Sequence, residues 1–134
     1  MKKTIAMISL ASVSILSAAI YADSNVKVVL TDPKKAIVVK QDNDEFTITM
    51  QANPTTGYGW YLTGFYSKYI EPEGMQFIPP TKQLMGAPGV DVWKFKIDDD
   101  AFKAPMLLTI RFVSMRPWDV STGKKQTYRV VTTS

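Results

Sequence analysis

Residues 46–52 read Phe-Thr-Ile-Thr-Met-Gln-Ala, an alternation of apolar and polar side chains. A period of two residues indicates a β-strand with one buried face and one face in water. A similar alternation returns in residues 93–97, 106–112 and 128–130, where large apolar residues alternate with lysine, threonine and arginine. The pattern therefore favours a protein built mainly of β-strands.

Shorter apolar segments at residues 26–30, 36–39 and 58–63 predict three more strands, and turn-forming residues separate all of these segments. About seven strands in one domain predict an all-β fold, an immunoglobulin-like β-sandwich. Trp60 suits the buried central tryptophan of such sandwiches. The expected turns are Asp42-Asn43-Asp44, Glu71-Pro72, Pro79-Pro80, Asp98-Asp99-Asp100 and Ser121-Thr122-Gly123.

The N-terminus predicts export. Two lysines precede a run of apolar and small residues, 5–20, which is shorter than the ~20 apolar residues of a membrane span. This layout is typical of a secretory signal peptide. We expect residues 1–22 to be the signal, cleaved after Ala22 or alternatively after Ala19. Residues 23–134 are then one exported domain, either periplasmic or secreted.

The overall charge gives no reason to expect an anionic partner. The chain has 16 basic and 12 acidic residues, and two lysines leave with the signal, so the exported part carries 14 − 12 = +2. No long basic run exists. We therefore expect no nucleic acid partner, and no membrane association once the signal is removed.

The chain contains no histidine and no cysteine. These absences exclude a Ser-His-Asp triad, a thiol nucleophile, histidine or thiolate metal sites and disulfides. Enzymes built on carboxylates, lysine or tyrosine stay possible, but the acidic residues are scattered over turns. The acidic triplet 98–100 lacks the spacing of a calcium loop and predicts a solvated turn. We expect no catalytic residue, no metal and no cofactor.

The first candidate loop connects two predicted strands and reads Asn53-Pro54-Thr55-Thr56-Gly57. Proline fixes its own φ and makes the preceding asparagine extended, while glycine permits a positive φ. The asparagine side chain can bond nearby backbone groups, and the threonines are stiff at χ1. We expect a rigid loop that loses little entropy on binding. On these residues alone, an ordinary strand connection remains the alternative.

The second candidate loop precedes the strand that begins near Val90. Its small residues let the backbone approach a partner closely, and two larger apolar residues before it could add contact area. A flexible surface turn is the alternative reading. The residues concerned are Leu84, Met85, Gly86, Ala87, Pro88 and Gly89.

The third candidate loop reads Arg116-Pro117-Trp118. Arginine and tryptophan are enriched at binding hot spots, and the proline between them restricts their relative orientation. Trp118 lies outside the alternating core pattern, unlike Trp60 and Trp93. We therefore expect Trp118 to be exposed or to bind a partner.

Together these motifs resemble those of the chagasin family of cysteine peptidase inhibitors. The first loop matches the family motif without change and is followed by the aromatic Tyr58; the third loop matches as well. The second matches a glycine-x-glycine-glycine motif only at Gly86 and Gly89, because Pro88 replaces one glycine. The resemblance extends from about residue 26 to residue 132.

The resemblance implies an immunoglobulin-like fold whose three loops form a wedge for the active-site cleft of papain-like cysteine peptidases. Residues 53–58, 84–89 and 116–118 would then contact the peptidase, with the first loop at the centre. Inhibition would be reversible occupancy, with no chemistry by the inhibitor, and we expect a monomer. The alternative is a non-inhibitory exported immunoglobulin-like binding or adhesion module, since such folds host many functions.

Overall fold

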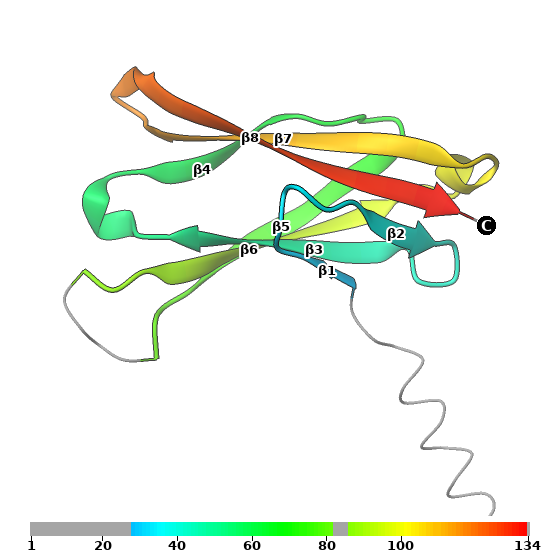
Figure 1. Cartoon of the computed structure of the whole chain (residues 1–134), viewed down its shortest axis with the longest axis horizontal. Helices are drawn as coiled ribbons and strands as arrows, with labels where there is room; N and C mark the ends of the chain where they lie inside the picture. Colours follow the sequence, from blue (N-terminus) through cyan, green and yellow to red (C-terminus); the bar gives the residue numbers. More distant parts are fainter. Residues whose placement is uncertain (1–27, 82–85, 134) are drawn as a thin grey trace, which may run out of the picture.

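The alternating apolar residues fold the chain into two four-stranded β-sheets that pack face to face (Figure 1). The structure is a computed structural model and describes residues 28–81 and 86–133. Two short 3₁₀ turns, η1 and η2, connect strands at opposite ends. The elements are β1 (Val28–Leu30), β2 (Ile37–Lys40), β3 (Glu45–Ala52), η1 (Pro54–Thr56), β4 (Gly59–Gly64), β5 (Ile70–Ile78), β6 (Gly89–Ile97), η2 (Asp99–Phe102), β7 (Met106–Arg116) and β8 (Asp119–Thr133).

One sheet has the order β1-β3-β6-β5 and the other the order β2-β8-β7-β4. The short edge strands β1 and β2 run parallel to their neighbours, while the other pairs are antiparallel. Consecutive strands change sheets repeatedly, so each sheet contains strands from both halves of the chain. The expectation of an all-β sandwich is confirmed, with eight strands where about seven were expected.

Aromatic rings join the two sheets at the centre of the core. Phe112 of β7 makes edge-to-face contacts with Trp93 and Phe95 of β6, at ring centroid distances of 5.1 and 6.3 Å. It also contacts Tyr128 of β8 at 5.9 Å, and Phe95 stacks on Phe46 of β3. Such pairs add roughly 0.5–1.5 kcal/mol each beyond the apolar area that they bury. The core therefore depends on the inward positions that alternation predicts.

The alternation of four segments is confirmed by burial. Side chains at the predicted inward positions of β3, β6, β7 and β8 are fully or partly buried. Trp60 and Trp93 both pack against the core, as expected. The expectation of a buried central tryptophan is wrong for Trp60, which is only partly buried and lies on the edge strand β4. Its indole Nε1 donates to the Gln51 carbonyl oxygen at 3.0 Å. A two-residue period thus located most of the core.

Strand β5 was missed, and the expected turn at Glu71-Pro72 is wrong. Both residues lie inside β5, paired with Lys96 and Phe95 of β6. Proline is tolerated there because β5 is an edge strand beside a register shift, where a missing N–H need not break the ladder. The expected turn at residues 121–123 is also wrong, because the hairpin turn is at residues 117–118 and residues 121–123 form an irregular part of β8 without partners in the ladder.

Several expectations fall on residues outside the described part of the chain. These are the signal peptide (1–22), the first two residues of the segment 26–30, and Leu84 and Met85 of the second loop.

Among the described residues, no helix is long and apolar enough to cross a membrane. In the same part of the chain, no three acidic residues gather closely enough to hold a metal ion.

The aromatic cluster gives a direct test of this core. Phe112→Ala should lower the free energy of unfolding by about 3–5 kcal/mol, because the side chain is fully buried and the cavity cannot close. Leu107→Ala, on the outer face of the same strand, is the matched control and should change it by less than about 0.5 kcal/mol. Urea denaturation measures both, and equal losses would contradict the assigned core.

Candidate functional site

Strand register brings the three candidate loops to one end of the sandwich (Figure 1). Ala52, the last residue of β3, pairs with Gly89, where the second loop enters β6. Gly59, just after the first loop, pairs with Met115, just before the third loop. Residues more than thirty positions apart therefore become neighbours, with the first loop between the other two.

The first loop has the conformation that its residues predict. Asn53 is extended, with φ −133° and ψ 90°, and it caps the 3₁₀ turn Pro54–Thr56. Gly57 ends the turn with a positive φ of 81°. The Asn53 side-chain oxygen accepts from the Thr55 backbone N–H at 3.3 Å. The expected proline, asparagine and glycine effects are confirmed.

Both threonine hydroxyls bond within the first loop. The Thr55 hydroxyl donates to the Asn53 side-chain oxygen at 2.5 Å. The Thr56 hydroxyl donates to the Asn53 carbonyl oxygen at 2.7 Å. Thr55 and Thr56 are exposed at the tip, but their hydroxyl hydrogens are already bonded. These bonds make the loop stiff, beyond the χ1 restriction of threonine.

Asn53 also links the first loop to the second. Its side-chain nitrogen donates to the Gly86 carbonyl oxygen at 2.8 Å. Gly86 adopts a positive φ of 81°, which suits glycine. The amide of one residue thus bonds its own loop through its oxygen and the neighbouring loop through its nitrogen.

Arg116 links the first loop to the third. Its Nε donates to the Thr56 carbonyl oxygen at 3.2 Å, and its guanidinium lies 4.6 Å from the centre of the Tyr58 ring. A cation over an aromatic face is worth about 0.5–1 kcal/mol at an exposed site. The arginine is half-buried by these contacts. It therefore holds the loops together from within the site.

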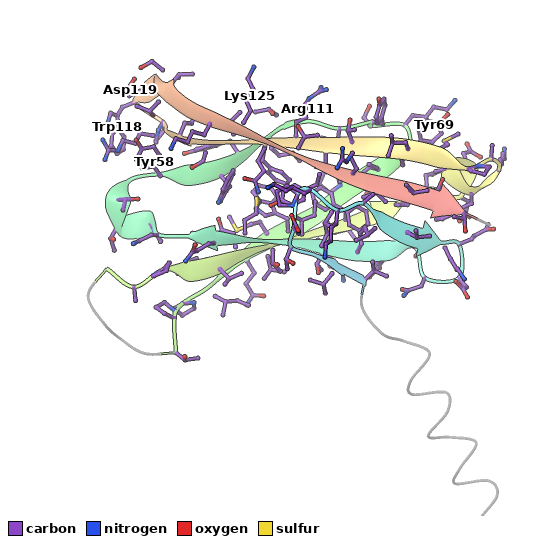
Figure 2. The ribbon with its side chains drawn as sticks, in the orientation of Figure 1. Tyr58, Tyr69, Arg111, Trp118, Asp119 and Lys125 are labelled. Atoms are coloured by element: carbon purple, nitrogen blue, oxygen red, sulfur yellow. The ribbon has the colours of Figure 1, made fainter. Side chains whose placement is uncertain are left out.

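Trp118 lies over Gly57 while most of its indole remains in solvent. A Cβ atom added at Gly57 would lie 2.7 Å from Cη2 of Trp118, a distance that real structures avoid. The tryptophan is nevertheless 72% exposed. Figure 2 shows Trp118 and Tyr58 close together where the hairpin of β7 and β8 meets the first loop. The expected exposure of Trp118 is confirmed.

Sequence reasoning missed part of this end of the molecule. Pro117 and Trp118 form the hairpin turn, and Arg116 pairs with Asp119 across it. Asp119 then accepts hydrogen bonds from the hydroxyls of Ser121 and Thr122. An aspartate followed by serine and threonine is a known local bonding pattern, so that signal was present in the sequence.

A buried carboxylate lies just behind the second loop. Asp91 is the next inward-facing residue of β6 after Gly89, and it is only 6% exposed. Burial raises the pKa of its carboxyl above the usual value, because the charged form loses solvation. It lies in the sheet rather than in a loop, and we assign it no contact with a partner.

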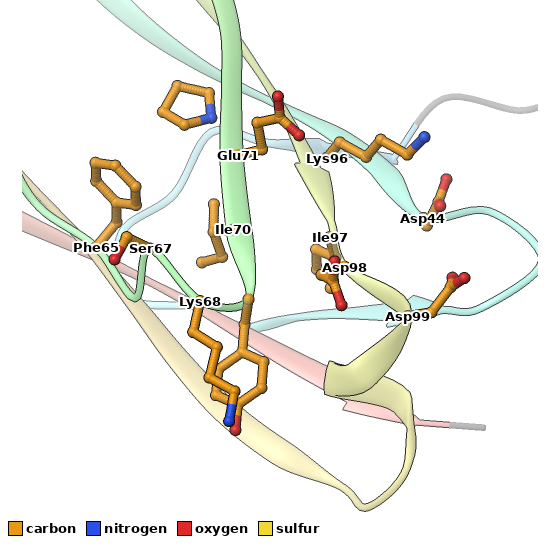
Figure 3. A pocket seen from close by; sticks show the side chains of 12 residues that line it. Asp44, Phe65, Ser67, Lys68, Ile70, Glu71, Lys96, Ile97, Asp98 and Asp99 are labelled. Atoms are coloured by element: carbon orange, nitrogen blue, oxygen red, sulfur yellow. The ribbon is translucent and has the colours of Figure 1, made fainter.

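A pocket of about 490 Å³ lies at the opposite end of the sandwich (Figure 3). It forms between the connection from β4 to β5 and the end of β6, where Ile70 pairs with Ile97. Its lining mixes both charges, as Lys68, Glu71 and Asp98 illustrate. None of the three loops contributes to it, so the loop end and this pocket are separate features.

Comparison with known proteins identifies the family. Residues 39–131 match the family model described as "Chagasin family peptidase inhibitor I42". This chain belongs to that family. The family is one of peptidase inhibitors and not of enzymes, and the match includes all three loops.

Individual relatives agree with this assignment. The chain is 32% identical to chagasin of Trypanosoma cruzi over 76 residues, covering 53% of this chain and 64%, less than two thirds, of chagasin. In fold it is similar to a cysteine protease inhibitor of Entamoeba histolytica, with a TM-score of 0.59, 22% identity and coverage of 78% and 94% of the two chains. It is also similar to amebosin, with a TM-score of 0.59, 18% identity and coverage of 81% and 99%.

Two glycines with the same φ of 81° provide a matched test of the loop packing. Gly57→Ala and Gly86→Ala should each cost about 1 kcal/mol of backbone strain. Only Gly57→Ala also places a methyl group against Trp118, since among the described residues no atom lies within 4 Å of a Cβ added at Gly86. The indole N–H resonance of Trp118 should therefore shift in the Gly57 variant and stay in place in the Gly86 variant. An unmoved resonance in both would contradict the packing.

The role of the Asn53 side-chain amide can be tested by a substitution that replaces only its nitrogen. Asn53→Asp keeps acceptors for Thr55 but cannot donate to Gly86, and its charge would face that carbonyl oxygen. Losing this bond should lower the free energy of unfolding by about 1 kcal/mol. It should also speed amide hydrogen exchange in the second loop. Thr55→Val is the control, because it removes a bond only within the first loop. Unchanged exchange in the Asn53 variant would mean that the loops are not coupled through this side chain.

Proposed function

We propose that this chain is a reversible inhibitor of papain-like cysteine peptidases and that its three loops occupy their active-site cleft. Family membership supports the inhibitor class. The observation that carries the proposal is the linkage of the loops: Asn53 bonds Gly86, and Arg116 bonds Thr56. The three motifs are therefore held as one rigid surface, as a wedge requires.

We propose a separate role for each loop. The first loop, with Thr55 and Thr56 exposed at its tip, would lie at the centre of the cleft. The second loop and Trp118 would contact the two walls. An interface of standard size, roughly 800 Å² on each partner, is within reach of three loops on one end of a small domain.

The hydrogen bonds of the first loop explain why it would obstruct rather than be cleaved. A substrate must present a carbonyl oxygen to the hydrogen-bond donors that stabilise the transition state. Here the Asn53 carbonyl accepts from Thr56, the Pro54 carbonyl from the Gly57 N–H, and the Thr56 carbonyl from Arg116. Cleavage at these bonds would require breaking the loop's own contacts. At these three peptide bonds, the loop would occupy the cleft without attack geometry.

We further propose that the protein acts after export, in the periplasm or outside the cell, and as a monomer. The N-terminal lysines and apolar run support export. A monomer suits the proposal because the three loops lie at one end of a single chain.

Inhibition assays of the purified protein test the proposal. Papain and several cathepsin-type peptidases should be inhibited, activity should return on dilution, and the inhibitor should remain intact by mass spectrometry. A serine peptidase such as trypsin is the class control and should be unaffected. Inactivity against every papain-like enzyme at micromolar concentration would overturn the proposal and favour the binding-module alternative.

Trp118 should be a hot spot of this interaction. Trp118→Ala should weaken inhibition of papain by at least about 2 kcal/mol, roughly 30-fold, because a large exposed aromatic side chain would lose its contact. Tyr66→Ala is the control, since Tyr66 is 49% exposed but lies at the far end of the sandwich. An unchanged inhibition constant for the Trp118 variant would exclude this residue from the interface.

A further inference from the structure

Two neighbouring side chains at the hairpin tip are the most exposed large apolar groups of the described residues. Trp118 is 72% exposed and Val120 is 68% exposed, ahead of Leu107 at 58% and Val38 at 54%. Trp118 belongs to the third loop, but Val120 lies outside all three motifs. An exposed valine beside a proposed hot spot extends the apolar surface of that loop.

The backbone at the tip is irregular, and this irregularity displays Val120. Arg116 pairs with Asp119, and the next pair along the ladder joins Ser114 to Lys124. One residue of β7, Met115, thus faces four residues of β8. Residues 120–123 therefore bulge out of the ladder, and we call residues 119–123 the tip segment. A bulge of this kind redirects side chains away from the sheet.

The tip segment is held in place by its own contacts. The Ser121 hydroxyl donates to the Asp119 carboxylate at 2.5 Å, and the Thr122 hydroxyl donates to the Asp119 carbonyl at 2.8 Å. Gly123 approaches β7 closely, because an added Cβ would lie 2.9 Å from Val113 and 3.2 Å from the Val120 carbonyl. Val120 is therefore presented on an ordered backbone, which lowers the entropy lost on binding.

We propose that Val120 is a further peptidase contact, packing against an apolar part of the cleft wall that Trp118 contacts. This inference rests on the proposed function. Three observations carry it: the exposure of Val120, its continuity with the third loop, and the ordered bulge that presents it. A wall that is polar or charged at this point would bind less tightly, so Val120 adds selectivity as well as affinity.

The experiment compares two substitutions at this position. Val120→Thr keeps the branched shape and replaces a methyl group with a hydroxyl, whereas Val120→Asp adds a charge. Against papain, the inhibition constant should rise about fivefold for the threonine variant and more than tenfold for the aspartate variant, since the loss of apolar contact is modest and burial of a charge is costly. Val38→Thr, equally conservative on an exposed valine of β2, should stay within about twofold.

Stability measurements separate contact from folding. Thermal unfolding of the Val120 variants should match that of the wild type, because an exposed side chain adds little to the core. If the wild type inhibits papain and both Val120 variants inhibit it equally well, this inference is overturned while the proposed function stands. If the wild type inhibits no papain-like peptidase, the proposed function itself fails, and the Val120 contact with it.

Discussion

The edge-to-face contacts of Phe112 with Trp93 and Phe95 join the two sheets and hold β7 against β6. This contact helps to set the spacing of the strands that carry the loops. The second loop leads into β6 and the third loop leaves β7, so the distance between these loops is fixed by the core behind them. The first loop connects β3 in one sheet to β4 in the other and spans the same junction. The functional surface is therefore positioned by apolar packing, and hydrogen bonds then refine it.

Those hydrogen bonds hold the first loop from both sides. Asn53 joins it to the second loop, and Arg116 joins it to the third. Each bond is worth only about 1 kcal/mol net, yet together they restrict loops that would otherwise move independently. A binding surface ordered in advance loses less entropy when a partner arrives. Stiffness, more than the number of exposed groups, is what these motif residues contribute.

The sequence revealed much of this because its signals were local. Alternation located the inward positions of β3, and proline and glycine determined the backbone at Asn53 and Gly57. Strand β5 was missed because Pro72 indicates a turn unless one knows that the strand lies at a sheet edge. The contact of Arg116 with Tyr58 joins residues 58 positions apart, and no local pattern encodes it. Physical reading of the residues found the loops but could not determine how they touch.

The same geometry bears on Pro88, where this chain departs from the family's glycine. Proline removes a backbone N–H, which would matter if the second loop were anchored through that amide. The link to the first loop instead runs from the Asn53 side chain to the Gly86 carbonyl, two residues before Pro88. Gly86 retains the positive φ that presents this carbonyl, and Gly89 enters β6 in register with Ala52. The described part of the second loop, residues 86–89, is thus held at both ends by groups that the substitution leaves intact. The proline limits the backbone conformations available between them.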